Sequence, residues 1–179
     1  MLSTKAIYQS ELFVLLAAIT GGHVQDGPDG MPQTIPLPEA YGKYFDKVKE
    51  LIGIPADYKI ELVSGMMNEE LYDPTARVVV IDDTDVMTNP DVLAIRKRFN
   101  IKSDDCFRVF VLAHELAHAK QYKEDRLHPI SKSETEETAD FNGKRYHLAI
   151  NGKEGYRNLP WEKEADEAAL KVCKALKLM

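Results

Sequence analysis

The sequence predicts an α+β protein, and three observations carry this prediction. Residues 21–40 contain so many glycines and prolines that neither a helix nor a central strand is expected there. The β-branched segment 76–81 (ARVVVI) has the strongest strand signal in the chain. From residue 89 onward the pattern of apolar residues is almost entirely helical. A helix, then strands, then several helices is typical of an α+β domain, here a single one covering residues 1–179.

Composition and charge exclude several classes of protein. The chain has 179 residues, of which 44% are hydrophobic and 29% charged, which is typical of a globular protein and too apolar for a disordered one. A net charge of −6 argues against a nucleic-acid partner, which usually requires a basic stripe. Two cysteines are too few for a disulfide framework and indicate reduced, buried thiols in a cytoplasmic protein.

The first forty residues are expected to form an N-terminal helix, 1–20, and a Gly/Pro-rich connector, 21–40, before a core at 41–179. The apolar run 12–19 is far shorter than the roughly 20 residues that span a bilayer, so no membrane partner is expected. A long connector usually runs over the surface or covers something. We therefore hypothesise that the connector lies near a cleft of the core and restricts entry to it.

The core is expected to begin with a helix and two strands. Residues 41–52 have apolar side chains at helical spacing. Segment 58–66 alternates as a strand does, and Asp73-Pro74 marks a turn before the second strand at 76–81. We expect the two strands to pair antiparallel, within a small antiparallel or mixed sheet.

Four helices are expected after these strands. Pro90 occupies a favourable first helical position. Ser103 is expected to cap the next helix, 104–122, whose side chains are apolar nearly all round, so that helix must be buried. Two further helices are expected at 133–150 and 160–178.

The buried helix contains the sequence His114-Glu115-Leu116-Ala117-His118. Two histidines four residues apart lie on one helix face, so both imidazoles can reach the same metal ion. Zinc binds such nitrogen ligands in tetrahedral geometry. Glu115 lies about 100° around the helix from His114, so it misses the metal but can contact a water bound there, as a general base does. Ionisable groups in an apolar helix are costly unless paired or metal-bound, which disfavours a purely structural explanation.

A catalytic zinc needs a third protein ligand and an open fourth position. Two segments offer a glutamate and, four residues later, an aspartate on one expected helix face: Glu136 with Asp140, and Glu162 with Asp166. In either pair the glutamate can bind metal while the aspartate hydrogen-bonds a ligating imidazole. Glu136 also fits a capping pattern with Ser133 at an acidic helix start, an explanation that Glu162 lacks. Glu162 is therefore the favoured third ligand and Glu136 the alternative.

The HELAH sequence followed by an ExxAD helix resembles the gluzincin metallopeptidases, in particular the minigluzincins and the ImmA/IrrE-like peptidases of phages and mobile elements. Segment 156–166 (YRNLPWEKEAD) carries the sharper part of this resemblance, because such proteins often have a tyrosine, a proline and E-x-E-A before the ligand helix. The resemblance implies Glu162 as the third ligand and Asp166 as its supporting partner. It also implies a short sheet packed on the buried active-site helix, with an edge strand near 76–81 that can hold an extended peptide.

These features predict a zinc metalloendopeptidase that acts on a peptide or protein substrate. His114, His118 and Glu162 bind Zn²⁺, and Glu115 is the general base for a zinc-activated water. Tyr156 is the expected donor to the oxyanion, with Tyr146, His147 and His128 as further candidates. Two alternatives stay open: an ImmA/IrrE-like regulatory protein that cleaves or binds a specific repressor, and a zinc-stabilised interaction module without turnover.

Overall fold

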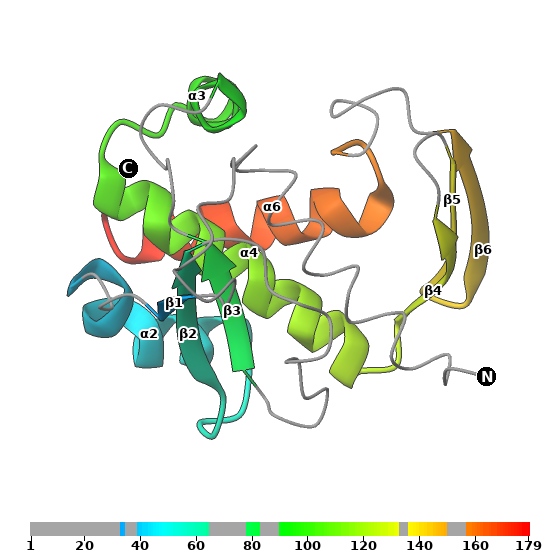
Figure 1. The fold of residues 1–179 in the computed structure, drawn as a ribbon, viewed down its shortest axis with the longest axis horizontal. Helices are drawn as coiled ribbons and strands as arrows, with labels where there is room; N and C mark the ends of the chain where they lie inside the picture. The colour runs from blue at the N-terminus through cyan, green and yellow to red at the C-terminus, as the bar shows by residue number, and fades with distance from the viewer. Residues whose placement is uncertain (1–32, 35–38, 65–77, 83–89, 133–135, 150–156) are drawn as a thin grey trace. The chain divides into compact units, whose positions relative to one another are not determined.

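The computed structural model describes residues 33–34, 39–64, 78–82, 90–132, 136–149 and 157–179 (Figure 1). The expected N-terminal helix 1–20 lies outside the described residues, as does most of the connector 21–40, including the hypothesis that it restricts entry to a cleft. The described residues form four helices and two three-stranded sheets, which confirms the α+β class. Among them, no helix is both long and apolar enough to cross a membrane.

Contacts divide the chain into two compact units, which are described separately. The first comprises Met1–Lys43, Asp57–Phe107 and Met179, and the second comprises Tyr44–Ala56 and Arg108–Leu178. The prediction that residues 1–179 form a single domain stays a prediction.

The first unit contains a mixed sheet with the strand order β1-β2-β3. Its strands are β1 (Gln33–Thr34), β2 (Lys59–Ser64) and β3 (Val78–Asp82). The predicted strands 58–66 and 76–81 are confirmed as β2 and β3, but the prediction that they pair antiparallel is wrong, because β2 and β3 are parallel. Parallel strands need a long crossover connection, and segment 65–77 between them is long enough to provide one. The antiparallel partner of β2 is β1, which lies inside the Gly/Pro-rich connector.

Three predicted helices begin where their sequence signals place them. Helix α2 (Glu39–Ile52) and helix α3 (Pro90–Phe99) match the expected segments closely. Helix α4 (Asp104–Lys123) is capped by Ser103, whose hydroxyl accepts a hydrogen bond of 3.2 Å from the backbone N–H of Cys106. The predicted burial of α4 is confirmed, and its buried apolar residues are Cys106, Phe107, Val109, Phe110, Leu112, Ala113, Leu116 and Ala117.

The predicted helix 133–150 is wrong, because this part of the second unit forms a three-stranded antiparallel sheet. Its strands, in the order β4-β5-β6, are β4 (Leu127–Lys132), β5 (Glu136–Phe141) and β6 (Lys144–Ala149). Asn142 and Gly143 form the two-residue loop between β5 and β6, with φ of 51° and 74°. Asn-Gly favours this left-handed backbone and is the strongest short-range signal for a hairpin, which outweighs the helical spacing of the apolar residues.

Helix α6 (Pro160–Ala175) closes the second unit and confirms the prediction of a helix at 160–178. Proline stands at its start, where the missing N–H costs no helical hydrogen bond. Trp161 packs its ring against Phe141 of β5 and Tyr146 of β6, at ring-centroid distances of 6.0 and 6.1 Å. These contacts belong to a cluster of buried residues that joins the sheet to the first turn of α6.

Candidate metal centre

Helix α4 places His114 and His118 one turn apart in the interior, where each side chain is 1% exposed. Their Nε2 atoms lie 3.1 Å apart, and the two rings meet edge to face at 82°. Two unprotonated ring nitrogens at this distance repel each other unless a proton or a metal ion lies between them. The helical spacing therefore buries two ring nitrogens whose lone pairs require a proton or a metal ion between them.

The third donor of the group is Glu162, from the first turn of α6. Its Oε2 lies 3.3 Å from Nε2 of His114, and its Oε1 lies 3.2 Å from Nε2 of His118. Glu162 is 1% exposed, so both carboxylate oxygens lie in the interior beside the histidines. The structure thus brings together the two histidines and the favoured glutamate of the sequence analysis.

Glu136 does not belong to this group. It begins strand β5 and is exposed, and within the described residues the group that can hold a metal comprises His114, His118 and Glu162. The expectation that Glu136 and Asp140 share a helix face is wrong, since both lie on that strand. Asp140 instead accepts hydrogen bonds of 2.8 and 2.9 Å from Arg145 of β6.

Asp166 supports His114 from the next turn of α6. Its Oδ1 lies 3.1 Å from Nδ1 of His114, a short contact without the alignment of a full hydrogen bond. The same oxygen accepts a hydrogen bond of 2.7 Å from Nη1 of Arg157. Because a carboxylate only accepts, this contact favours a hydrogen on Nδ1 of His114 and leaves Nε2 available to a metal.

Glu115 lies beside the group without joining its contacts. The side chain is 1% exposed, and within the described part of the chain neither carboxylate oxygen has a hydrogen-bond partner. Burial raises the pKa of Glu115, an effect partly opposed by the nearby His114 and His118. A buried carboxylate with no partner is costly, so this residue points to a ligand or to a functional role.

His114 and Glu162 strongly affect each other's pKa values. Burial disfavours the charged form of His114, but the adjacent carboxylates of Asp166 and Glu162 outweigh it and raise the pKa of His114 to about 9. Burial likewise disfavours an ionised Glu162, yet the two histidines hold the pKa of Glu162 well below its ordinary value. Without a metal, the group is therefore expected to hold a proton on a histidine at neutral pH.

The donor set fits a zinc ion. Ligands about 2.0–2.1 Å from a tetrahedral zinc lie about 3.3–3.4 Å from one another. The three contacts among His114, His118 and Glu162 measure 3.1, 3.3 and 3.2 Å. Two imidazoles and one carboxylate are also the ligand chemistry of catalytic zinc sites with an open fourth position.

Sequence reasoning missed two residues that support this group. Gln121 is 0% exposed, and its Oε1 lies 2.9 Å from Nδ1 of His118. Its position three residues after His118, on the same helix face, is a signal that could have identified it. Arg157 is 8% exposed and precedes α6, with no motif to mark it.

Among the described residues, the further oxyanion candidates Tyr146, His147 and His128 contact other partners and are outside the metal group. Tyr156 lies outside the described residues. Tyr146 packs on Trp161, Nδ1 of His147 lies 2.9 Å from the Thr138 hydroxyl, and Nε2 of His128 lies 2.9 Å from the Asp125 carbonyl oxygen. Both cysteines are buried, as predicted.

Comparison with protein-family models, with curated proteins and with solved structures found no significant match to this chain.

Proposed function

We propose that this chain is a zinc-dependent metallopeptidase of the gluzincin type that hydrolyses bonds within a peptide or protein substrate. His114, His118 and Glu162 are the metal ligands, Asp166 supports His114, and Glu115 is the general base. The short sheet with an edge strand for an extended substrate, expected from the resemblance, belongs to this proposal. So does a cytoplasmic location, which suits two buried thiols.

One observation carries the proposal: three buried donor groups converge at 3.1–3.3 Å beside a buried carboxylate that has no hydrogen-bond partner in the described structure. A structural zinc site requires only ligands. The additional cost of burying Glu115 is explained if its carboxylate acts on a water molecule or a substrate.

In the proposed hydrolysis, Glu115 and Asp166 have different roles. Zinc, when bound, supplies a Lewis acid that activates water and polarises the peptide carbonyl. Glu115 takes the proton of the attacking water on its carboxylate and delivers it to the leaving amine nitrogen, for which a raised pKa is favourable. Asp166 holds His114 in orientation during these steps.

The test compares wild type with Glu115→Gln, using purified protein loaded with zinc. Peptide cleavage is followed with a mixture of quenched fluorescent peptides, and bound zinc is measured on the same samples. We expect Glu115→Gln to retain one zinc and to lose cleavage by at least about 100-fold, since a general base contributes 10²–10⁴-fold. Equal cleavage by the two proteins would contradict the role of Glu115. Zinc binding without cleavage by wild type would instead favour the interaction module, or a regulatory protein restricted to one repressor.

A further inference from the structure

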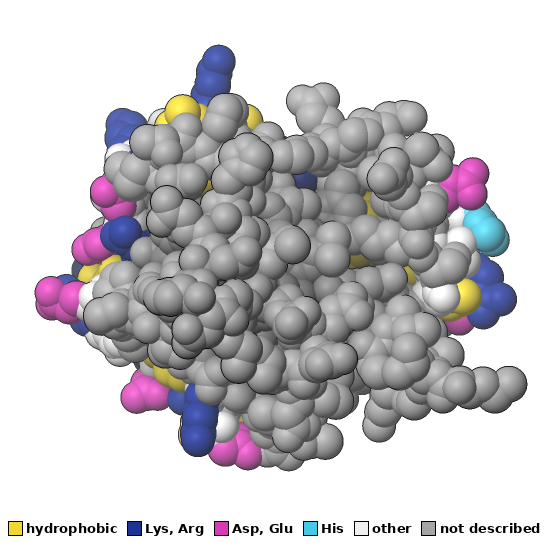
Figure 2. Space-filling model, viewed as in Figure 1, with side chains coloured by type: hydrophobic (Ala, Val, Ile, Leu, Met, Phe, Trp, Pro, Cys, Tyr) yellow, Lys and Arg dark blue, Asp and Glu magenta, His cyan; other side chains and the backbone are white. Residues whose placement is uncertain are grey.

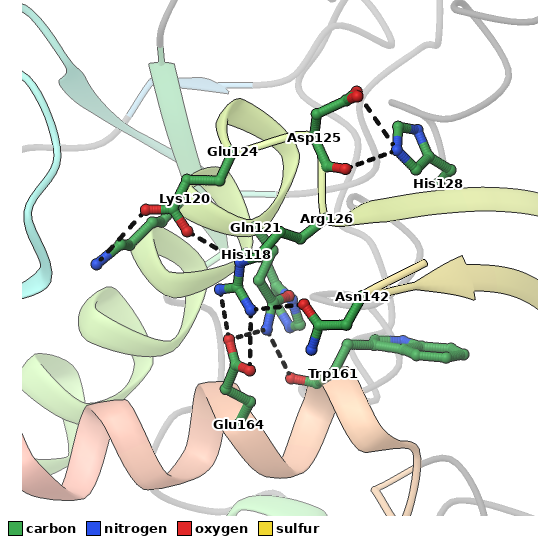
Figure 3. A network of polar contacts seen from close by, with 10 residues as sticks. All are labelled: His118, Lys120, Gln121, Glu124, Asp125, Arg126, His128, Asn142, Trp161 and Glu164. Carbon is green, nitrogen blue, oxygen red and sulfur yellow. Dashed lines mark hydrogen bonds and ion pairs between the residues drawn. The ribbon is translucent and has the colours of Figure 1, made fainter. Parts of the chain in front are cut away.

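Gln121 is a completely buried amide that links the candidate metal centre to the surface of the second unit. It lies one turn after His118 on α4 (Figure 3). Its side chain is 0% exposed. Its Nε2 donates hydrogen bonds to the backbone oxygen of Trp161, at 3.1 Å, and to Oε1 of Glu164, at 3.2 Å. Its Oε1 faces Nδ1 of His118 at 2.9 Å.

These partners determine which way the amide points. A backbone oxygen and a carboxylate can only accept hydrogen bonds, so the NH₂ group of Gln121 must face Trp161 and Glu164. The amide oxygen therefore faces His118. Because that oxygen cannot donate, Nδ1 of His118 must carry the hydrogen between them. In the tautomer with this hydrogen on Nδ1, the lone pair that can bind a metal lies on Nε2, the atom that faces Glu162 at 3.2 Å.

Glu164 is itself held in place by a cation. Arg126, between α4 and β4, donates to both carboxylate oxygens of Glu164, at 2.7 and 3.1 Å. Arg126 also donates to Oδ1 of Asn142, at 3.1 Å, and Nε of the same guanidinium donates to Glu124, at 2.9 Å. A two-point contact between Arg126 and Glu164 fixes the orientation of the acceptor that Gln121 uses.

The two histidines are thus supported in different ways. His114 faces a carboxylate that is bound to Arg157, whereas His118 faces a neutral amide. A carboxylate stabilises a positively charged imidazole, and an amide oxygen specifies the tautomer with much less effect on charge. The amide therefore suits a ligand that must present an unprotonated Nε2.

We propose that Gln121 is a positioning residue that holds His118 in the metal-binding tautomer, and that Glu164 and Arg126 fix the orientation of Gln121. This inference rests on the proposed function only in taking His118 as a metal ligand, and it holds whether or not the protein cleaves peptides. Partners of this kind typically change metal affinity by about 10- to 100-fold when they are removed.

The test measures the zinc dissociation constant by competition with a chromophoric chelator, together with the melting temperature of the metal-free protein. Gln121→Met keeps the length of the side chain and removes both polar ends. The double variant Gln121→Glu with Glu164→Gln keeps an acceptor for His118 and a hydrogen bond between positions 121 and 164, but it removes the donor to the backbone oxygen of Trp161. Glu167→Gln, an exposed change on α6, controls for the removal of a carboxylate from that helix by Glu164→Gln.

We expect Gln121→Met to weaken zinc binding by about 10- to 100-fold. The double variant should bind zinc more tightly than Gln121→Met, because it still offers His118 an acceptor, and Glu167→Gln should stay within about twofold of wild type. If Gln121→Met does not fold, Gln121→Asn replaces it, because a shorter amide keeps the buried polarity but withdraws from His118. Here we expect weakening by about tenfold.

Unchanged zinc affinity in Gln121→Met, or in Gln121→Asn, together with a lower melting temperature would overturn the inference and make Gln121 a packing residue. The zinc affinity of His118→Ala shows whether the metal centre itself exists, independently of the role of Gln121. If wild type binds no zinc, or if His118→Ala binds it as tightly as wild type, the proposed function fails along with the role of Gln121. If only the Gln121 variants match wild type, the metal centre stands and the inference alone is wrong.

Discussion

Zinc binding is expected to release about one proton per ion near pH 7.5, because His114 must lose a proton to become a ligand. In the metal-free protein the carboxylates of Asp166 and Glu162 outweigh the effect of burial and raise the pKa of His114 to about 9. At pH 7.5 this imidazole is therefore almost fully protonated. A metal ligand must be deprotonated, so the ion displaces that proton.

The size of the effect follows from the two pKa values. An ordinary histidine titrates near 6.5, and His114 near 9. Between these pH values the folded, metal-free protein holds a proton that the unfolded chain has lost. The associated stability, roughly 3 kcal/mol, is fully present below pH 6.5 and is lost as the pH rises through 9. Apparent zinc affinity changes in the opposite direction, rising about tenfold per pH unit until it levels off near pH 9.

Calorimetric titration of the metal-free protein with zinc measures this directly. Observed heats in buffers with different ionisation enthalpies give the number of protons released, and repeating the titration at several pH values gives the slope. Release of about one proton at pH 7.5, falling towards zero above pH 9, would agree with the structure. A zinc affinity that does not change between pH 6.5 and 9 would refute the assigned charge of His114.

Two further predictions concern stability. Arg157→Met removes the 2.7 Å partner of Asp166 and leaves protonated His114, at 3.1 Å, as the remaining cation beside it, so urea unfolding of the metal-free protein should show a loss of about 1–3 kcal/mol. The exposed change Lys163→Met is the control, and a loss below about 1 kcal/mol for Arg157→Met would show that Asp166 does not depend on this cation. Gly143→Ala should cost about 1 kcal/mol in the same assay, since φ is 74° and an added Cβ meets no atom within 4 Å. An unchanged midpoint of urea unfolding would mean that the hairpin loop tolerates a residue with a side chain at position 143.

The sequence predicted α4 and its two histidines well because both depend on local rules. A serine cap, acidic residues in the first turn and an almost entirely apolar face define the helix, and i,i+4 spacing then brings His114 and His118 together. The choice between Glu162 and Glu136 depends instead on tertiary packing. Helical spacing made both plausible, and among the described residues Glu162 lies with the two histidines whereas Glu136 is exposed on β5.

The errors come from competing local signals and from pairing between distant segments. In 133–150 the acidic start and the spacing of apolar residues indicated a helix, while Asn142 and Gly143 favoured a hairpin. Alternation also supports the strand, because Ala139 and Phe141 enter the buried cluster from one face of β5. The parallel pairing of β2 and β3 has no local signal, since it depends on the connection between them.

The described surface charges give no reason to change the prediction that the protein does not bind nucleic acid. Figure 2 shows both acidic and basic side chains among the described residues, and the full sequence has a net charge of −6. The absence of a nucleic-acid partner stays a prediction.

Zinc content after equilibrium dialysis tests the metal centre most directly, comparing wild type with Glu162→Ala and Glu136→Ala. Glu136→Ala is the matched control, because it removes an exposed glutamate from β5 that lies outside the metal group. We predict one zinc per chain in wild type and in Glu136→Ala, and a dissociation constant raised by about 100-fold or more in Glu162→Ala. Wild-type zinc affinity in Glu162→Ala would contradict the assignment of His114, His118 and Glu162 as the metal ligands.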